Sequence, residues 1–378
     1  MDMGEYRKVF FRLDYLLLLA VAVIIGIGLV VLNSASSHEA GNQVLKQIIS
    51  ICIGLVVFLI SLNFEYNIFS KYYRQIYVFT ILMLIAVLIF GHEAGGAKSW
   101  FKFPVIGTFQ PSEVAKILLI ISYAQFLEDR RGHLNTLWEL IQAFMFFVPP
   151  VLLILMQPDM GSAMVFLAIM IGMLFMAGAN WKWLLGIFGG GLVAGIGYII
   201  GIWKFGWWSP LMKHQLNRFL VLFDSTIDRQ GVGWNAWQAK IAIGNGGFFG
   251  QGIGSGTQSA GDFLPEQWTD FIFAVLCEEL GFIGASVILI MFGVLLYRGI
   301  KIAMTSRDFY GSLVAIGVVT MFFFHVFENV GMNIGIMPIA GIPLPFISYG
   351  GSAVLANFMG IALLENIYMR RESLSFRE

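Results

Sequence analysis

Long apolar stretches dominate the pattern of hydrophobic and polar positions along this chain. Ten of them are long enough to cross, as helices, the roughly 30 Å hydrocarbon core of a bilayer. They span residues 13–33, 46–62, 74–91, 112–127, 137–156, 161–178, 183–202, 270–297, 312–332 and 350–367. The pattern predicts an all-α polytopic membrane protein of about ten transmembrane helices, forming a single domain over residues 1–378.

The composition agrees with a membrane location. Hydrophobic residues make up 58% of the chain and charged residues only 12%, and the mean hydropathy is +0.79. A soluble globular protein carries about 25% charged residues, and a soluble chain this apolar would expose large apolar patches. The first apolar run follows Arg7, Lys8 and Arg12. It is longer than the core of a signal peptide and similar runs follow it, so we interpret it as a retained helix.

The distribution of positive charge predicts the orientation. With both termini in the cytoplasm, 14 of the 23 Lys and Arg residues lie inside, eight lie outside, and Lys116 falls within a run. Five of the eight outer charges sit in one long loop, about residues 203–268, and long loops contribute little to the positive-inside rule. We therefore expect cytoplasmic termini and one large extracytoplasmic loop.

Motifs for nucleotides and metals are missing from the sequence. The glycine-rich stretch Gly244–Gly261 contains neither GxxxxGK[ST] nor GxGxxG, so we interpret it as a tightly folded loop lying on the membrane surface. The formal net charge is zero, which gives no indication of nucleic-acid binding. Cys52 and Cys277 lie in apolar runs and are expected to be small buried hydrophobic residues rather than a disulfide.

Charged residues at membrane depth are costly and often mark function. In the segment Gln110–Lys116, Glu113 and Lys116 are three residues apart and share a helix face. They form either a local ion pair at a helix start, or a cation held by its carboxylate neighbour toward a cavity. Asp159, in a break between two runs, either serves only as the cap of the next helix or has a function of its own.

The segment Leu264–Phe273 closes the long loop and opens an apolar run. Thr269 or Asp270 is a candidate N-cap of that helix, which would be a sufficient structural reason for either residue. Glu278 and Glu279 follow, and three acids within ten residues exceed what capping requires. Asp270 is expected at the membrane–water boundary, where a lipid-linked head group would rest and where a carboxylate can act as a general base.

The segment Gly341–Ser352 is rich in proline and glycine. Pro343 and Pro345 exclude a regular helix, and non-helical backbone at this depth is tolerated only where it is buried in protein or lines a wet cavity. We expect it to shape a site; a plain re-entrant connector is the alternative. His325 and Glu328 share a face of the ninth run, where an interhelical hydrogen bond would explain them.

Together these segments resemble the SEDS family of bacterial membrane proteins (shape, elongation, division and sporulation), and best its RodA branch. The matching segments occur in family order across most of the chain. They are residues 96–100, 110–116, 157–161, 218 with 223–224, 231–238, 242–247, 256–258, 264–274, 278–281 and 343–352. The chain departs from the family pattern at Ser99, Ser225 and Trp268, where Arg, Pro and His are common.

The resemblance implies a ten-helix fold and a peptidoglycan glycosyltransferase that polymerises lipid II on the outer face of the bacterial plasma membrane, for cell elongation and rod shape. It also implies contact with undecaprenyl-linked glycan and membrane lipid, and a class B penicillin-binding protein as transpeptidase partner, with no nucleic acid. Asp270 matches the family's essential acid. Glu113, Lys116 and Asp159 match polar positions of its central cavity.

Glycan polymerisation requires a base, cations for a diphosphate leaving group, and an apolar groove for the lipid tails. We assign Asp270 as the general base of a single displacement with inversion. The candidates for binding substrate and pyrophosphate are Lys116, Glu113, Lys98, Arg218, Asp159, Glu266, Ser348 and Ser352. A divalent cation, Mg²⁺ or Mn²⁺, held by outer carboxylates such as Asp159 and Glu266 would share that task, because these ions prefer oxygen ligands.

Alternatives from other functional classes stay open. A flippase or transporter of lipid-linked precursors would use the same Glu113, Lys116 and Asp159, but it predicts important charges near mid-membrane. A pure scaffold would need no such set of acids and cations. A division- or sporulation-specific paralogue of the polymerase is a further alternative. The enzyme is favoured because the charged candidates gather at the expected outer boundary.

Overall fold

The computed structural model describes residues 12–37, 42–94, 97–103, 107–209, 212–223, 227–228, 231–261 and 263–371. Within these residues, eight helical segments are long and apolar enough to cross a membrane. They are α2 (Tyr15–Ala35), α3 (Gln43–Ser61), α5 (Tyr73–Phe90), α7 (Leu137–Leu155), the continuous α9–η1–α10 segment (Trp181–Phe205), α14 (Ile272–Met304), α15 (Phe309–Ile334) and α16 (Gly351–Met369).

Two further helices, α6 (Pro111–Glu128) and α8 (Met160–Met176), occupy the remaining predicted runs. α8 is shorter, with 17 residues, and α6 is a continuous helix whose apolar sequence includes the charged residues Glu113 and Lys116. Each of the ten predicted runs therefore corresponds to a helix. The prediction of about ten transmembrane helices is confirmed, and the chain is a multi-pass membrane protein.

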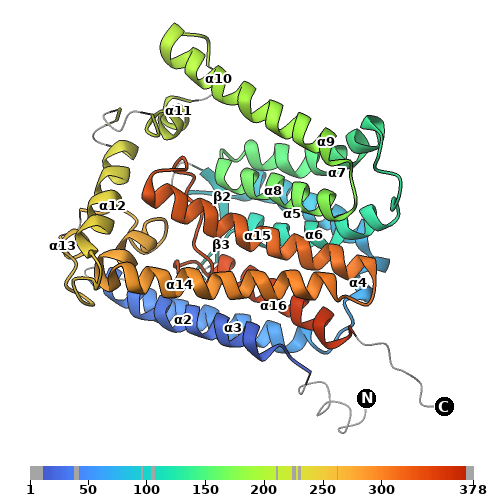
Figure 1. The fold of residues 1–378 in the computed structure, drawn as a ribbon, viewed down its shortest axis with the longest axis horizontal. Helices are drawn as coiled ribbons and strands as arrows, with labels where there is room; N and C mark the ends of the chain where they lie inside the picture. The colour runs from blue at the N-terminus through green and yellow to red at the C-terminus, as the bar shows by residue number, and fades with distance from the viewer. Residues whose placement is uncertain are drawn as a thin grey trace.

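The two C-terminal helices form the centre of the bundle. Buried residues make up 67% of the most apolar window of α15 and 83% of that of α16, against 17% for α3 and α5. α15 packs against α14, α8 and α6, and α16 packs against α3 and α6. Figure 1 shows α15 between α8 and α14, with α9 and α10 crossing above them. The peripheral helices thus keep apolar faces available to lipid.

The two cysteines differ in their surroundings. Cys277 is buried, as expected, but Cys52 is exposed, and both are free thiols. The expectation of burial was wrong for Cys52 because it lies on α3, a peripheral helix with few buried positions.

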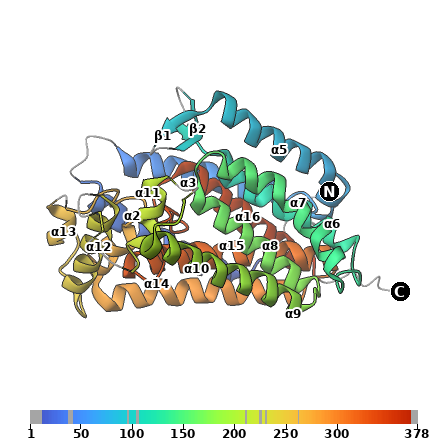
Figure 2. The ribbon, with the colours of Figure 1, turned by 90° about the horizontal axis from the view of Figure 1, so that it is seen from above.

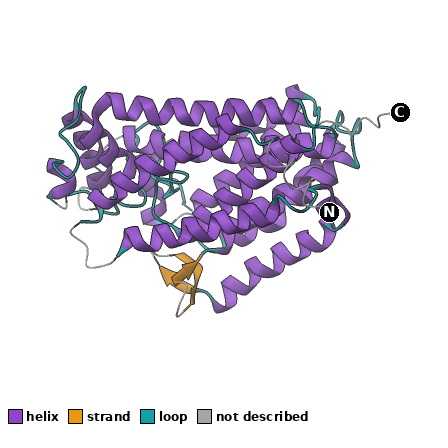
Figure 3. Cartoon of the chain, turned by 90° about the horizontal axis from the view of Figure 1, so that it is seen from below, coloured by secondary structure: helices purple, strands orange, loops and turns teal. Residues whose placement is uncertain are grey.

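Three short strands between α5 and α6 form a small antiparallel sheet that the helical prediction did not include. They are β1 (His92–Ala94), β2 (Ala97–Phe103) and β3 (Gly107–Phe109), with β2 in the middle. Phe101 pairs with Phe109 and Lys102 with Thr108. Figures 2 and 3 show the strands beyond the end of α5. Aromatic residues suit strands, but strands this short give no distinct period in the sequence.

The long loop between α10 and α14 contains three helices among its described residues. Its helices are α11 (Lys213–Leu220), α12 (Val232–Gly246) and α13 (Thr257–Ala260). α12 packs against both α14 and α15. Figure 1 shows these three helices at one end of the bundle, so the loop is folded onto the helical domain there.

The glycine-rich stretch after α12 lies against the first turns of α14. The backbone N–H groups of Gln251 and Gly252 donate to the carbonyl oxygens of Glu278 and Glu279 at 2.9 and 3.0 Å. A Cβ at Gly250 would overlap the backbone of Glu279, so this close approach requires glycine. The predicted tight folding is confirmed, and its cause is packing against protein.

The beginning of α2 and the end of α16 lie at the same end of the bundle. The backbone N–H of Asp14, just before α2, donates to Oε2 of Glu365 in the last turns of α16 at 2.9 Å. In Figure 1 this end lies opposite α12 and α13. The arrangement agrees with an even number of membrane crossings.

Candidate active site

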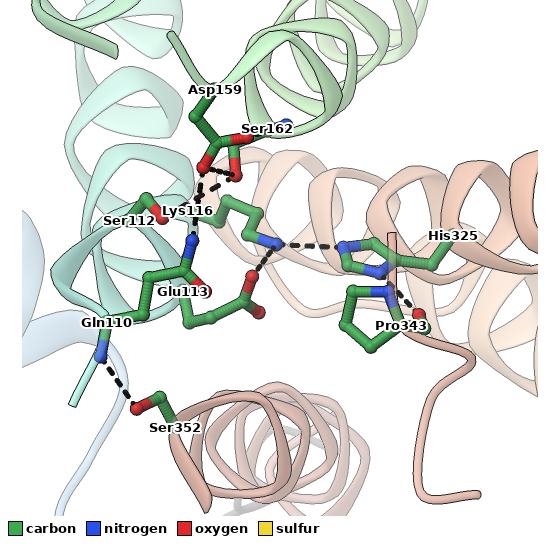
Figure 4. A network of polar contacts seen from close by, with 9 residues as sticks. All are labelled: Gln110, Ser112, Glu113, Lys116, Asp159, Ser162, His325, Pro343 and Ser352. Atoms are coloured by element: carbon green, nitrogen blue, oxygen red, sulfur yellow. Dashed lines mark hydrogen bonds and ion pairs between the residues drawn. The ribbon is translucent and has the colours of Figure 1, made fainter. Parts of the chain in front are cut away.

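The first polar cluster lies at the start of α6. Nζ of Lys116 is 2.8 Å from Oε1 of Glu113, one turn earlier, and 2.9 Å from Nε2 of His325 on α15. Lys116 is 1% exposed and Glu113 is 4% exposed. Figure 4 shows the lysine between its two partners. The predicted ion pair is confirmed, and these three residues are called the Lys116 cluster below.

The hydrogen bonds of His325 fix its tautomer. Nδ1 of His325 lies 3.1 Å from the carbonyl oxygen of Pro343, and a carbonyl oxygen can only accept. Nδ1 therefore carries the proton, and Nε2 accepts from the Lys116 ammonium, which can only donate. The expected interhelical hydrogen bond is confirmed for His325, and neutral His325 connects α6 to the proline-rich segment.

A second set of contacts surrounds Asp159, the N-cap of α8. Its Oδ1 accepts the Ser162 N–H at 2.9 Å, and its Oδ2 accepts from the Ser162 hydroxyl at 2.7 Å and from Nε2 of Gln110 at 3.1 Å. The capping role is therefore confirmed. The backbone N–H of Gln110 donates to Oγ of Ser352 at 2.8 Å. Figure 4 shows these residues beside the Lys116 cluster, so α6, α8, α15 and α16 all contribute.

Asp270 lies in a turn just before α14. The N-cap of α14 is Phe271, so the expectation that Thr269 or Asp270 caps this helix is wrong. The backbone of Asp270 is instead held by hydrogen bonds from side chains of α15. The carbonyl oxygen of Asp270 accepts from Nδ2 of Asn329 at 3.0 Å and from Nδ2 of Asn333 at 3.1 Å, both on α15.

The carboxylate of Asp270 is partly buried and has charged neighbours. Burial, and secondly the Glu266 carboxylate, raise the pKa of Asp270 to about 6, whereas the Arg218 guanidinium acts in the opposite direction. A Cβ at Gly341 would lie 3.2 Å from Oδ2 of Asp270. In the described part of the structure no hydrogen bond reaches the Asp270 carboxylate oxygens. The group is thus an acid that can take up a proton near neutral pH.

Glu328 on α15 is a further acid near Asp270. Its side chain is fully buried, and among the described residues neither carboxylate oxygen has a hydrogen-bond partner of standard geometry. The Ala340 backbone is a nearby polar group, and Asp270 and Arg218 act on Glu328 electrostatically. His325 and Glu328 are close in sequence on one helix, but His325 contacts Lys116 whereas Glu328 is near Asp270.

The segment Gly341–Ser352 is non-helical up to Gly350, as expected. Its backbone and side chains reach the turn that carries Asp270. The Ser348 hydroxyl donates to the carbonyl oxygen of Thr269 at 2.6 Å, and the carbonyl oxygen of Ile342 accepts from Nδ2 of Asn329 at 2.8 Å. The predicted site residue Ser348 thus supports the neighbour of Asp270.

Glu278 and Glu279 have structural partners. The Glu278 carboxylate accepts the N–H groups at the start of α13, from Gln258 at 2.7 Å and from Ser259 at 3.1 Å. The Glu279 carboxylate accepts from the Ser34 hydroxyl and from the Gly254 N–H. Hydrogen bonding to the folded loop, and for Glu279 also to Ser34 on α2, therefore explains two of the three acids that capping did not explain.

The remaining predicted residues lie apart from the Lys116 cluster. Nζ of Lys98 donates to the carbonyl oxygen of Ile89 at the end of α5 at 3.0 Å. Glu266 is exposed, and its Oε2 accepts from the Thr269 hydroxyl at 3.2 Å. Arg218 lies in the last turn of α11, within electrostatic reach of Asp270. Asp224 and Ser225, also singled out from the sequence, lie outside the described residues.

Comparison with known proteins identifies the family. The family model FtsW/RodA/SpoVE, described as a cell cycle protein, matches residues 14–373. The chain belongs to the FtsW/RodA/SpoVE family. The resemblance inferred from the sequence is therefore confirmed over nearly the whole chain.

Several members of the FtsW/RodA/SpoVE family align along almost their full length. The chain is 34% identical to peptidoglycan glycosyltransferase MrdB of Escherichia coli K12, covering 96% of this chain and 95% of MrdB. It is 34% identical to stage V sporulation protein E of Bacillus subtilis, covering 94% and 96%, and 32% identical to peptidoglycan glycosyltransferase RodA of Treponema pallidum, covering 95% and 98%.

Solved structures of the family have the same fold. The Thermus thermophilus rod shape determining protein RodA superimposes with a TM-score of 0.70 at 26% identity, covering 96% of this chain and 98% of that chain. A chain from a peptidoglycan synthase complex, studied for the coordination of polymerization and crosslinking, gives a TM-score of 0.79 at 28% identity, covering 95% and 98%.

A bound divalent cation was one prediction for this site. The described residues contain no group of three or more His, Cys, Asp or Glu side chains arranged to hold a metal ion. The oxygens of Asp159 are engaged by Ser162 and Gln110, and Oε2 of Glu266 by Thr269. In this arrangement the predicted pair, Asp159 and Glu266, does not fit as metal ligands.

Sequence reasoning did not find the asparagines that hold Asp270. Asn329 and Asn333 are fully buried in the otherwise apolar α15. With His325 they form a row at intervals of four residues, which places them on one helix face. That spacing was the available signal, but the backbone carbonyls that they bind come from distant segments and have no pattern of their own.

Proposed function

We propose that this protein is a peptidoglycan glycosyltransferase that polymerises lipid II on the outer face of the bacterial plasma membrane, with Asp270 as its general base. The observation that carries the proposal is the state of Asp270. Its carboxylate is partly buried, has a pKa raised to about 6, and lies near Arg218. The curated relatives MrdB and RodA, which align along almost their full length, are named peptidoglycan glycosyltransferases.

The reaction joins a sugar hydroxyl to the anomeric carbon of a lipid-linked donor. Asp270 takes the proton of the acceptor's 4-hydroxyl as the new bond to donor C1 forms. The C1–oxygen bond to the diphosphate breaks, and undecaprenyl diphosphate leaves with the bonding electron pair. General-base assistance of this kind contributes about 10²–10⁴-fold in rate. A single displacement inverts the anomeric centre.

The leaving diphosphate requires positive charge that is oriented in advance. Arg218 is the cation placed nearest to this role, because it already acts on Asp270, whereas Lys98 binds the end of α5. Lys116 is 1% exposed and doubly hydrogen-bonded. Contact between Lys116 and the diphosphate would therefore require the Lys116 cluster to open when substrate binds.

Charge and topology support an outer location of the site. The excess of Lys and Arg predicts that the helix ends near Asp14 and Glu365 face the cytoplasm, and Asp270 belongs to the other end, beside α11 and α12. Lys116 lies only about 8 Å along α6 from Pro111, at a rise of about 1.5 Å per residue. The key charges thus cluster toward the outer boundary, as an enzyme acting outside requires, and not at mid-membrane.

A class B penicillin-binding protein is the proposed partner, supplying the transpeptidase that crosslinks the new strands. The likeness to a chain of a peptidoglycan synthase complex supports an association of this kind. The resemblance of the sequence to the RodA branch supports a role in cell elongation and rod shape, with division or sporulation as the alternative.

Purified protein in detergent or liposomes, supplied with labelled lipid II, tests the activity. We expect glycan strands from the unaltered protein, with added partner included as a parallel sample, and about 10²–10⁴-fold slower polymerisation from Asp270→Asn. Asparagine keeps the shape of the side chain but cannot take the proton. Transport of lipid II across the liposome membrane by the unaltered protein, without polymerisation either with or without the added partner, would support a flippase and refute the polymerase.

A further inference from the structure

A row of buried polar side chains on α15 connects the two halves of the candidate site. His325, Asn329 and Asn333 are spaced by four residues, so they stack along one face of the helix. They are 3%, 0% and 0% exposed. The row covers about 12 Å of helix at about 1.5 Å per residue. At one end His325 belongs to the Lys116 cluster, and at the other end Asn333 contacts Asp270.

Every member of the row binds backbone or side chains from other elements. His325 contacts Lys116 and the Pro343 carbonyl oxygen. Nδ2 of Asn329 donates to the carbonyl oxygens of Ile342 at 2.8 Å and Asp270 at 3.0 Å. Asn329 thereby links the backbone of Asp270 to the backbone of Ile342. The neighbour of Ile342, Gly341, lies beside the Asp270 carboxylate.

Asn333 completes the support of Asp270. Its Nδ2 donates to the Asp270 carbonyl oxygen at 3.1 Å and to the Asn329 carbonyl oxygen at 2.8 Å. One carbonyl oxygen therefore accepts two side-chain donors from the same helix. A buried carbonyl outside regular secondary structure needs such partners, but a single donor would be enough for that purpose.

We propose that Asn329 and Asn333 are positioning residues that hold the Asp270 turn at a fixed place relative to the Lys116 cluster. The inference rests on the proposed function, because it takes Asp270 as the base. A working base has to be placed within about 0.5 Å. In the described structure the Asp270 carboxylate accepts no hydrogen bond, so its placement depends on its backbone.

The test compares polymerisation kinetics of purified Asn329→Leu, Asn333→Leu and the double variant. Leucine has a similar size and removes the donors. We expect kcat to fall about tenfold in each single variant, because one donor remains, and about 10²-fold or more in the double variant, since a displacement near 1 Å costs about that much. KM should stay within about twofold.

Asn366→Leu provides a matched control at the opposite end of the bundle. Nδ2 of Asn366, on α16, also donates to two backbone carbonyl oxygens, those of Ser61 at 2.8 Å and Phe64 at 2.6 Å. This change removes the same kind of donated hydrogen bonds, and also those that Oδ1 of Asn366 accepts from the Tyr66 N–H at 3.3 Å and from Nη1 of Arg370 at 2.7 Å. It should therefore lower thermal stability at least as much as Asn329→Leu does. Its kcat should stay within about twofold of the unaltered protein.

Two results would overturn the positioning role: an unchanged kcat in the double variant, or a loss of kcat in Asn366→Leu equal to that of Asn329→Leu. If the double variant does not fold, the two single variants decide by the same criteria. A fully active Asp270→Asn protein would instead refute the assigned base. A slow Asp270→Asn protein together with unaffected asparagine variants would refute only this inference.

Discussion

Two aspartates at opposite ends of the bundle illustrate how the same side chain is used for structure and for chemistry. Asp14, before α2, is 2% exposed, and its carboxylate accepts the Leu17 N–H at 3.2 Å and Nε of Arg298 at 2.6 Å. Asp270, before α14, is partly buried, and its carboxylate accepts no hydrogen bond in the described structure. Both lie just before a transmembrane helix.

The difference lies in which part of each residue is held. At Asp14 the carboxylate itself is saturated by a cap and an ion pair, which leaves no oxygen free for a substrate. At Asp270 the backbone is anchored by Asn329 and Asn333, and the carboxylate keeps its capacity to accept a proton. A partly buried charge without a hydrogen-bond partner costs stability, so its presence here indicates function rather than folding.

The sharpest way to break this comparison is to neutralise both aspartates in turn. Asp270→Asn should slow polymerisation by about 10²–10⁴-fold, because the base is lost, with no loss of thermal stability. Initial rates with labelled lipid II and melting temperatures in the same detergent measure both effects. A melting temperature that falls together with the rate would mean that Asp270 is structural, like Asp14.

Lys116→Met should have the next largest effect, about 10²-fold on kcat if this cation stabilises the leaving diphosphate. The single change also leaves Glu113 buried without its partner at 2.8 Å, which can cost about 3–5 kcal/mol. The double variant Glu113→Gln/Lys116→Met removes that unpaired charge. We expect the double variant to recover stability but not rate; recovery of both would remove Lys116 from the chemistry.

The sequence predicted the bundle more completely than the site. Runs of apolar residues give the number and place of the helices, because each must span the hydrocarbon core by itself. Residues that interact within one helix were also predictable: Glu113 pairs with Lys116 at a spacing of three, and Asp159 caps the helix that follows it.

The parts that were not predicted depend on contacts between distant segments. The partner of His325 is Lys116, 209 residues away, and Asn329 reaches Asp270 over 59 residues. Glu278 and Glu279 looked like further members of an acidic site, because the loop that folds back onto them cannot be inferred from local pattern. The network that positions the candidate base is therefore tertiary in origin.

The pH dependence of the polymerisation rate tests the difference between Asp270 and Asp14 through the ionisation of one group, the Asp270 carboxyl. The pKa of Asp270 is about 6, raised chiefly by burial, so the base is mostly protonated at pH 5 and mostly ionised at pH 7. Polymerisation should fall about tenfold between pH 7 and pH 5, following a single ionisation. Initial rates across pH 5 to 8 measure this, and a flat profile would contradict Asp270 as the base.

The titration of Asp270 also predicts that the stability of the folded protein changes with pH in the opposite direction to the rate. The folded-state pKa of Asp270 lies above its ordinary value of 3.8, so the folded protein binds this proton more tightly than the unfolded chain does. The resulting stabilisation is complete below about pH 4 and is lost as the pH rises through about 6. Glu266, Arg218 and Glu328 face the same carboxylate, so Asp270→Asn should flatten this dependence only in part.

The smallest expected effect on rate comes from Asp14→Asn, although it removes half of a buried ion pair. Arg298 would lose its charged partner at 2.6 Å, and breaking a buried pair in this way can cost about 3–5 kcal/mol. Because Asp14 lies at the end of the bundle opposite Asp270, polymerisation by the folded fraction should stay within about twofold. Thermal melting should fall while kcat per folded molecule is kept. The opposite outcome would be full stability with a lost rate. It would mean that the Asp14 carboxylate, which is saturated with hydrogen bonds and far from Arg218, takes part in the reaction. Hydrogen-bond saturation would then no longer separate structural acids from catalytic ones in this protein.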